Sequence, residues 1–195
     1  MYYFVGIDEA GRGPLAGPVA VGIARLPHTF NKRHLKGIKD SKKLSPQQRE
    51  LWFEKMKQWQ SQGLMDFAVS LISASVIDSK GISQAIKQGM KNCLRKVKAQ
   101  PADYIFLDGG LKAPLIYIEQ ETIIKGDEKI PAISLASIAA KVTRDKYMTN
   151  LASKKKYEHY QFHIHKGYGT QLHRNLIKKH GACDIHRTSF LGRIL

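Results

Sequence analysis

The feature that most constrains the fold is a short apolar run at the beginning of the chain. Residues 2–7 are aromatic, β-branched or glycine, and the run stops at Asp8. A continuous run of this length is typical of a strand that is buried on both faces. The sequence therefore predicts a central strand with two acidic residues, Asp8 and Glu9, directly after it.

The order of the further elements indicates the fold class. Short apolar runs predict strands, and apolar residues at helical spacing predict helices, the first of which Ser45 is suited to cap. Strands that come first and then alternate with helices predict an α/β fold, a mixed sheet with helices on its faces. The strands are expected at residues 18–24, 64–72, 104–107 and 121–125, and the helices from Pro46 and over about 82–98, 132–155 and 170–180.

The charge of the chain indicates its partner. Lys and Arg total 32 against 16 Asp and Glu, which gives a formal net charge of +16. Residues 141–195 hold 12 of the basic residues, only 3 of the acidic ones and six of the eight histidines. A field of this sign attracts polyanions, nucleic acid first and an anionic membrane second. The charge alone does not distinguish such a partner from a role in solubility.

Several absences in the sequence indicate where the protein works. No apolar run reaches the roughly 18–20 residues that a membrane span needs. The N-terminal apolar run is followed by two acidic residues, Asp8 and Glu9, too early for a signal peptide. Two cysteines, Cys93 and Cys183, are too few for a disulfide framework. We therefore expect a cytoplasmic monomer that does not contact a membrane.

Four acidic residues fall at the ends of predicted strands: Asp8, Glu9, Asp108 and Asp127. Neighbouring strand ends converge at one edge of such a sheet, where clustered carboxylates repel one another unless a cation joins them. Ligands that are all oxygen suit Mg²⁺ or Mn²⁺ rather than Zn²⁺. Two such ions about 3.5–4 Å apart commonly hydrolyse phosphodiesters. Alternatively, the acids are ordinary caps and turn formers.

Three further motifs could bind a substrate beside these acids. In Gly11-Arg12-Gly13 the glycines allow the backbone to approach a ligand closely with its N–H groups outward. Tyr168, flanked by glycines, could protrude and stack on a sugar or base. The polar loop over residues 40–45 could bind phosphate. Each motif also has a structural explanation, as a tight turn, a core aromatic residue and a solvated loop.

Seven segments of the chain carry a resemblance to a known family. They are IDEAGRGP at 7–14, DSKKL at 40–44, LDG at 107–109, GD at 126–127, ASIAAKVTRD at 136–145, HKGYGT at 165–170 and HRTSF at 186–190. In this order they resemble bacterial ribonuclease HII, the type 2 ribonuclease H. The resemblance covers nearly the whole chain, and the combination is far more specific than any single segment.

The resemblance implies an RNase H-like fold with a five-stranded mixed sheet, flanking helices and a C-terminal helical extension. Residues 1–195 would form one domain, with a core over about 1–155 and a basic helical portion over about 156–195. The implied activity is endonucleolytic hydrolysis of the RNA strand of RNA–DNA hybrids and cleavage at single ribonucleotides embedded in duplex DNA. The products would carry 5′-phosphate and 3′-hydroxyl ends.

The resemblance also implies a role for each matching residue. The metal-binding carboxylates are expected to be Asp8, Glu9, Asp108 and Asp127, with Mg²⁺ or Mn²⁺. Gly11, Arg12 and Gly13 would sense the ribose 2′-OH at the junction of RNA and DNA. Tyr168 would stack on the deoxyribose that follows, and Lys42 would contact a phosphate near the cut.

The fourth carboxylate is a choice between Asp127 and Asp145. Asp145 lies in the basic part of the long predicted helix beside Arg144, where an intrahelical ion pair explains it. Asp127 follows Gly126 at a predicted strand end, like the other acids, so we expect it to be the ligand. Lys141, one helical turn after Ser137, either faces the site or packs its stem.

The histidines and Cys183 allow two other interpretations. Zinc could be held by His163 and His165 together with His159, His173 and Cys183, but their spacing fits no standard structural site, and we expect solvated histidines instead. Cys183 near His186 lacks the orienting acid of a nucleophile–base pair.

Two other function classes remain open at this point. The first is a non-catalytic nucleic-acid-binding module in which the acids are structural and the basic C-terminal portion binds. The second is another carboxylate-metal nuclease of the same fold, such as a Holliday-junction resolvase or a DNA exonuclease. Metal-dependent cutting of a labelled hybrid separates the first from an enzyme, and all-DNA substrates separate the second.

Overall fold

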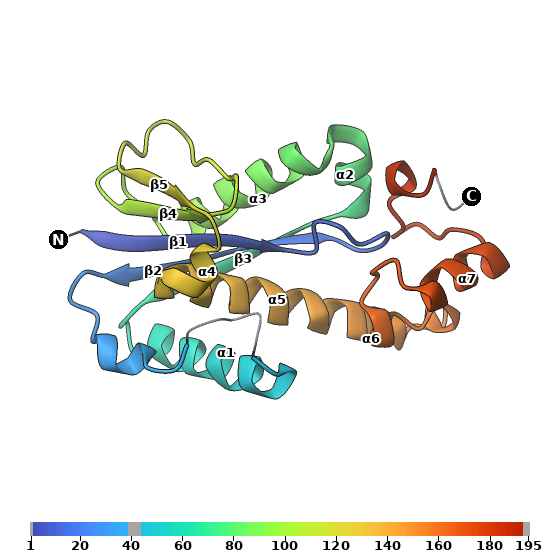
Figure 1. The fold of residues 1–195 in the computed structure, drawn as a ribbon, viewed down its shortest axis with the longest axis horizontal. Helices are drawn as coiled ribbons and strands as arrows, with labels where there is room; N and C mark the ends of the chain where they lie inside the picture. Colours follow the sequence, from blue (N-terminus) through green and yellow to red (C-terminus); the bar gives the residue numbers. More distant parts are fainter. Residues whose placement is uncertain (1, 39–43, 193–195) are drawn as a thin grey trace.

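The protein is built on one mixed sheet, seen in a computed structural model that describes residues 2–38 and 44–192 (Figure 1). The five strands lie in the order β3-β2-β1-β4-β5, which confirms the expected α/β architecture and the central place of the first strand. β1 runs antiparallel to β2 and parallel to β4. The strands are β1 Tyr3–Ala10, β2 Val19–Pro27, β3 Asp66–Ile72, β4 Tyr104–Asp108 and β5 Gln120–Ile123.

The four predicted helices are all present. Ser45 caps the first of them by a reciprocal pair of hydrogen bonds with Gln48, and Pro46 occupies its first position. Three shorter helices, α2, α4 and α6, come in addition, and no helix of the described residues is long and apolar enough to cross a membrane. The helices are α1 Pro46–Ser61, α2 Ala74–Lys80, α3 Ile82–Lys96, α4 Gly126–Lys129, α5 Pro131–Ala152, α6 Phe162–His165 and α7 Gln171–His180.

Helices cover the two faces of the sheet in separate layers. α2 and α3 lie on one face, and α1 and α5 lie on the other (Figure 1). The first layer packs the apolar face of α3 mainly against β2 and β3, in a core that continues over β1 and β4. The second packs Trp52, Met56 and Trp59 of α1 against the alanine-rich surface of α5. Two cores, one on each face, therefore hold the central strand β1 in the interior.

The register of the sheet places two acids side by side. Ile7 of β1 pairs with Leu107 of the parallel strand β4, so Asp8 and Asp108 are the next residues along the two strands. Side chains alternate along a strand, and Ile7 and Leu107 both belong to the core under α3. Asp8 and Asp108 therefore face the opposite side, toward α5.

Two glycines let α5 pack directly on the backbone of the sheet. A Cβ atom on Gly6 would lie 2.0 Å from the carbonyl carbon of Ala132, and one on Gly22 would lie 2.2 Å from the carbonyl oxygen of Ala136. No side chain other than hydrogen fits in these gaps. Because the helix approaches this closely, residues of α5 reach the acids of β1 and β4.

The C-terminal part packs on the end of α5 and on the loop after β1. Tyr157, Tyr160 and Phe162 form a small apolar cluster with Met148 of α5 and with Ala16. Ala16 also forms an antiparallel bridge with His186. The boundary near residue 155 stays a prediction.

The expected positions of the acids are wrong in detail. Asp108 is the last residue of β4 rather than the residue after it. Asp8 and Glu9 lie within β1, which continues to Ala10, because the backbone pairing with β2 extends to Ala10 and Ala20. Asp127 does not lie at a strand end: β5 stops at Ile123, and Asp127 is in the first turn of α4.

The close packing of α5 predicts that Gly6→Ala destabilises the protein. The added methyl group has to displace the helix backbone, which costs on the order of 2 kcal/mol or more. Urea unfolding should show a lower midpoint for this variant. Gly110→Ala is the control, since nothing lies within 4 Å of a Cβ there. Equal midpoints for the two variants would contradict this packing.

Candidate active site

One cavity brings most of the predicted site residues together. Its volume is about 430 Å³, and it lies at the C-terminal ends of β1 and β4, beside α5. A cavity of about 490 Å³ near the other end of β1 is mostly apolar, and the described residues around it include no carboxylate. The charged cavity is therefore the candidate site. It is lined by Asp8, Glu9, Ala10, Gly11, Arg12, Gly13, Arg49, Asp108, Ser137, Lys141 and Tyr168.

Asp8 is a buried carboxylate with an altered acidity. Only 4% of the residue is exposed, and its Oδ1 accepts the backbone N–H of Glu9 at 2.7 Å. The pKa of Asp8 is raised to about 7, above all by burial. The charges of Asp108 and Glu9 contribute to the rise, and a hydrogen bond from Ser137 opposes it. Asp8 therefore binds a proton, or another cation in its place, far more readily than a surface aspartate does.

Glu9 adds a second acid and brings a cation with it. Burial raises the pKa of Glu9, and the nearby charge of Arg12 acts in the opposite direction. Nη1 of Arg12 lies 3.4 Å from Oε1 of Glu9, and 56% of the Arg12 side chain is exposed. An ion pair this exposed holds its partners weakly. The Arg12 guanidinium can therefore leave Glu9 and bind a phosphate in its place.

Asp108 is fixed by the segment that carries Asp127. Its Oδ1 accepts the backbone N–H of Gly126 at 2.7 Å. The next residue, Asp127, is completely buried, and the hydroxyl of Ser134 donates to its backbone carbonyl. Asp127 is thus the sequence neighbour of Gly126, which binds Asp108, but Asp127 itself does not line the cavity. Its assignment as the fourth ligand stays a prediction.

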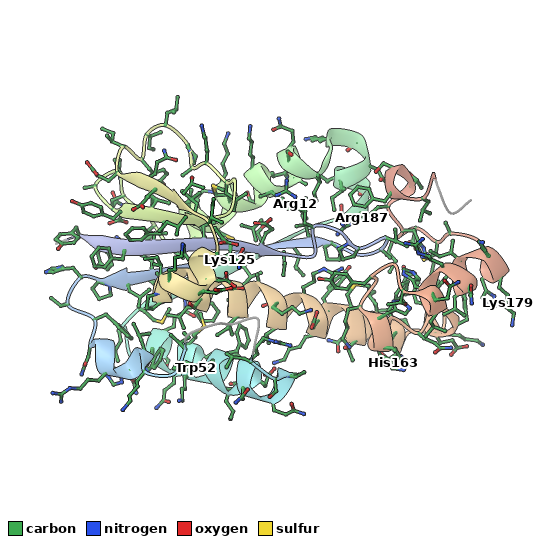
Figure 2. All side chains as sticks on the ribbon, in the orientation of Figure 1. Arg12, Trp52, Lys125, His163, Lys179 and Arg187 are labelled. Atoms are coloured by element: carbon green, nitrogen blue, oxygen red, sulfur yellow. The ribbon has the colours of Figure 1, made fainter. Side chains whose placement is uncertain are left out.

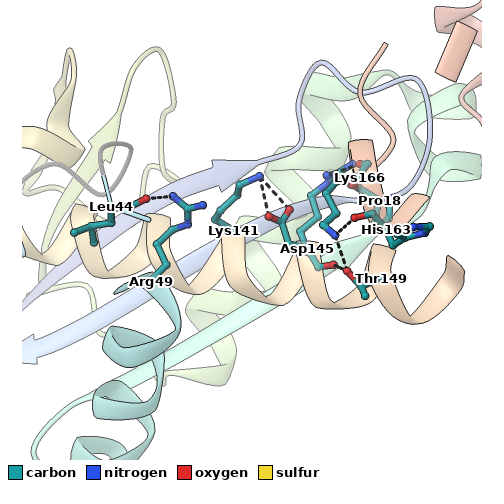
Figure 3. Close-up of polar contacts among 9 residues, drawn as sticks. Pro18, Leu44, Arg49, Lys141, Asp145, Thr149, His163 and Lys166 are labelled. Carbon is teal, nitrogen blue, oxygen red and sulfur yellow. Dashed lines mark hydrogen bonds and ion pairs between the residues drawn. The ribbon is translucent and has the colours of Figure 1, made fainter. Parts of the chain in front are cut away.

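Helix α5 supplies a polar edge to the cavity. Ser137 and Lys141 are one turn apart and both line it, so Lys141 faces the site. Figure 3 shows Lys141 and Asp145 facing each other, with Nζ 3.0 Å from the carboxylate. Asp145 is therefore in an intrahelical ion pair, as expected, but its partner is Lys141 rather than Arg144. Arg144 is instead buried and binds backbone carbonyls.

Tyr168 forms the rim of the cavity beside α5. It is 39% exposed, and both Nζ of Lys141 and Cζ of Arg144 lie 5.5 Å from its ring centre. Cations near a ring face attract it, which limits the orientations of the ring. The neighbouring Lys166 is held by Thr149 and by the carbonyl of His163 (Figure 3). Tyr168 is therefore an exposed aromatic surface rather than a core residue.

The cavity contains two residues that the sequence did not single out as site residues. The only feature of the sequence that could have indicated Ser137 is its spacing of four residues from Lys141. Arg49 carries none, because it comes from α1 and reaches the cavity only through the fold. Lys42, the expected phosphate contact, lies outside the described residues. The histidines also differ from expectation, since His165, His173 and His186 are buried rather than solvated.

The donor chemistry of the cavity fits a divalent cation. Asp8, Glu9 and Asp108 surround one space with carboxylate oxygens, the ligands that Mg²⁺ and Mn²⁺ prefer. Burial, and after it the repulsion between the carboxylates, raises the pKa values of Asp8 and Glu9, so a cation bound among them would stabilise their ionised forms. In the described residues no three acidic, histidine or cysteine side chains form a complete metal-binding group. A cation would therefore have to draw the carboxylates together.

Comparison with known proteins identifies the class and then the family. The ribonuclease H2 structure from Pyrococcus horikoshii matches with a TM-score of 0.77 at 28% identity, over 98% of this chain and 96% of that one. The structure of Bst-RNase HIII in complex with Mn²⁺ shares the fold, with a TM-score of 0.62 at 16% identity, over 92% of this chain and 63% of that one. The fold is thus that of a ribonuclease H.

The family is defined by the sequence. The model of the family described as Ribonuclease HII matches residues 5–192. The Ribonuclease HII of Caldicellulosiruptor bescii is 43% identical over 195 residues, which is all of this chain and 89% of the relative. The chain therefore belongs to the ribonuclease HII family, and ribonuclease H activity follows from this membership.

The raised pKa of Asp8 predicts that this residue destabilises the metal-free protein. The folded protein holds the proton on Asp8 more tightly than the unfolded chain does. The free energy of unfolding therefore falls as the pH rises from about 4 to about 7, where Asp8 ionises, and it stays lower above that range. In a chelator at pH 8, Asp8→Asn should raise the free energy of unfolding by on the order of 2 kcal/mol.

The measurement is urea unfolding of both proteins between pH 4 and pH 8.5. The difference between variant and wild type should grow across the window and level off above it. Asp66→Asn is the control, because Asp66 is exposed on β3. A difference that does not change with pH would refute the assignment of a perturbed Asp8.

Proposed function

We propose that this chain is a divalent-metal-dependent endonuclease that hydrolyses the RNA strand of RNA–DNA hybrids. It would also cut on the 5′ side of single ribonucleotides embedded in duplex DNA, leaving 5′-phosphate and 3′-hydroxyl ends. One observation carries the proposal: Asp8, Glu9 and Asp108 share a cavity with a Gly-Arg-Gly loop and an exposed tyrosine. Family membership supports the broader activity.

Asp8, Glu9 and Asp108 would hold the cation, with Asp127 as a fourth carboxylate. A bound divalent cation would neutralise charge on the scissile phosphate and lower the pKa of water. Ser137 and the amide of Glu9 keep the Asp8 carboxylate in place. The amide of Gly126 does the same for Asp108. These bonds orient two of the carboxylates individually, and a cation would still have to draw the three together.

The cations around the cavity are suited to a phosphodiester backbone. Arg12, Arg49 and Lys141 come from three different elements and surround the carboxylates. Each can bind a phosphate oxygen and so orient the strand across the site. No histidine is among the described residues that line the cavity, so proton transfer does not depend on an imidazole there. The chain's own residues would thus position the strand, and a bound cation would supply the activation of water.

The Gly-Arg-Gly loop and Tyr168 would recognise the substrate. Backbone groups of Gly11, Arg12 and Gly13 can bind a ribose 2′-OH, the group that distinguishes RNA from DNA. Tyr168 offers its ring to the sugar of the following deoxynucleotide. The net charge of +16 supports binding of the duplex backbone. We also propose that the enzyme acts as a monomer in the cytoplasm.

The carboxylate assignment predicts that Asp8→Asn abolishes cleavage of a duplex with one ribonucleotide while binding of the duplex survives. The reason is that the variant removes a metal-binding oxygen but leaves the cationic surface intact. Cleavage is measured with Mg²⁺, with Mn²⁺ and with chelator, and binding by fluorescence anisotropy. Asp66→Asn should cleave like wild type.

Three results would overturn this proposal. Undiminished cleavage by Asp8→Asn would remove the carboxylate from the chemistry. Binding by wild type without metal-dependent cutting would favour a non-catalytic module. Efficient cutting of all-DNA duplexes would favour another nuclease of this fold.

A further inference from the structure

Two arginines are completely buried beneath the proposed substrate-binding loop. Arg144 and Arg187 are both 0% exposed, although burial of a charge is costly and ordinarily requires a carboxylate partner. Neither guanidinium has an ion pair within the described part of the chain. Both donate to backbone carbonyl oxygens instead, three for each side chain. Two buried charges that are used in this way indicate that the loops they bind have to be held in a fixed conformation.

Arg187 binds the backbone of the Gly-Arg-Gly loop itself. Its Nη2 donates to the carbonyl of Gly11 at 2.7 Å, and its Nη1 donates to the carbonyl of Arg12 at 2.9 Å. Its Nε donates to the carbonyl of Gly17 at 3.0 Å. Arg12 and Arg187 lie near each other at the end of the sheet (Figure 2). The planar guanidinium thus holds two successive peptide groups of the loop at once.

Because the peptide group is planar, the hydrogen bonds from Arg187 also fix the direction of the N–H groups in the loop. In a trans peptide the C=O and the N–H point in opposite directions. The carbonyl of Gly11 shares its peptide with the N–H of Arg12, and the carbonyl of Arg12 shares its peptide with the N–H of Gly13. Because Arg187 holds both carbonyls in the interior, both N–H groups point outward to the cavity. Among the described residues no backbone carbonyl accepts a hydrogen bond from either N–H group.

Arg144 supports the same loop from behind. A Cβ atom on Gly11, where φ is +85°, would lie 2.0 Å from Nε of Arg144, so the loop packs on this side chain. Arg144 also donates to the carbonyls of Ala16 and Lys166, at 3.1 and 3.0 Å. It therefore joins the segment after the loop to the segment before Tyr168.

A chain of hydrogen bonds connects His186, the neighbour of Arg187 in the sequence, with the backbone of Tyr168. Nδ1 of His186 accepts the N–H of Cys183 at 2.9 Å, so the proton of His186 is on Nε2. That Nε2 lies 3.1 Å from Nε2 of His173, whose Nδ1 is 2.9 Å from the carbonyl of Tyr168. Only a donating Nδ1 satisfies that carbonyl, so Nε2 of His173 accepts. Burial lowers the pKa of both histidines to about 4, which keeps the chain neutral.

We propose that Arg187 is the positioning residue for recognition of the ribose 2′-OH. It aims the N–H groups of Arg12 and Gly13 at the substrate, and its neighbour His186 fixes the Tyr168 segment through His173. The two parts of the proposed recognition surface, which are about 155 residues apart in the sequence, are thereby held as one rigid unit. This inference rests on the proposed function, in which the loop binds the 2′-OH.

The test compares two duplexes that differ by one oxygen atom, one with a single ribonucleotide and one that is all DNA. Binding is measured in chelator, where no cleavage occurs, for wild type and for Arg187→Lys. A lysine keeps the charge but cannot hold three carbonyls in a plane. The preference of wild type for the ribonucleotide duplex should fall at least fivefold in the variant, with little change in affinity for DNA.

Arg25→Lys is the matched control. Arg25 is also a buried arginine, but its Nε binds Asp103 at 2.8 Å near the other end of the sheet. This variant should lower the melting temperature and leave the preference for the 2′-OH unchanged. If Arg187→Lys does not fold, His173→Phe replaces it in the test. Phenylalanine keeps a ring against His165 but removes both nitrogen atoms from the chain, and a loss of at least threefold is expected.

The outcomes separate this inference from the function on which it rests. If wild type does not cut the ribonucleotide duplex with any divalent metal, the proposed function fails. If wild type cuts but shows no preference, or if Arg187→Lys keeps the preference of wild type, only the role of Arg187 is overturned. If His173→Phe keeps the preference of wild type, the link from His186 to the Tyr168 segment is overturned. An equal loss of affinity for both duplexes indicates a merely structural role and also overturns it.

Discussion

The whole arrangement depends on the contact between α5 and the backbone of the central strands. Gly6 and Gly22 leave no space between the helix and the sheet. This contact buries Asp8, brings Ser137 to its carboxylate and places Lys141 at the edge of the cavity. The parallel pairing of β1 with β4 then adds Asp108 beside Asp8. An acidic site is thereby built in the interior, where carboxylates are least stable as anions.

The distribution of charge follows from that placement. Three carboxylates in one cavity repel one another, and the protein compensates only in part, with Arg12 at the entrance and backbone amides behind. The remaining demand for positive charge is what a divalent cation would meet. Outside the cavity the surplus of Lys and Arg gives the protein a positive field of the kind that attracts polyanions. The two buried arginines form a third group, which orders loops rather than binding phosphate.

Much of the fold and of the candidate site could be predicted from the sequence, for reasons that differ between residues. The strand over residues 2–7 and the helix capped by Ser45 were predictable, because local composition and capping determine them. The end of β1 was not, since pairing with β2 carries the strand past the acids. Arg49 reaches the site only through the fold, and the burial of Arg187 and His173 depends on contacts between distant segments. Periodicity carries no information about such contacts.

We propose that buried carboxylates and a 2′-OH-binding loop act on one phosphodiester. The most direct test maps the cut in a duplex with a single ribonucleotide in the presence of Mg²⁺ or Mn²⁺. A cut on the 5′ side of the ribonucleotide, with a 5′-phosphate and a 3′-hydroxyl, is the predicted result. A cut on its 3′ side that leaves a 2′,3′-cyclic phosphate would contradict the account. It would mean that the 2′-OH is the nucleophile and not the group that the loop recognises.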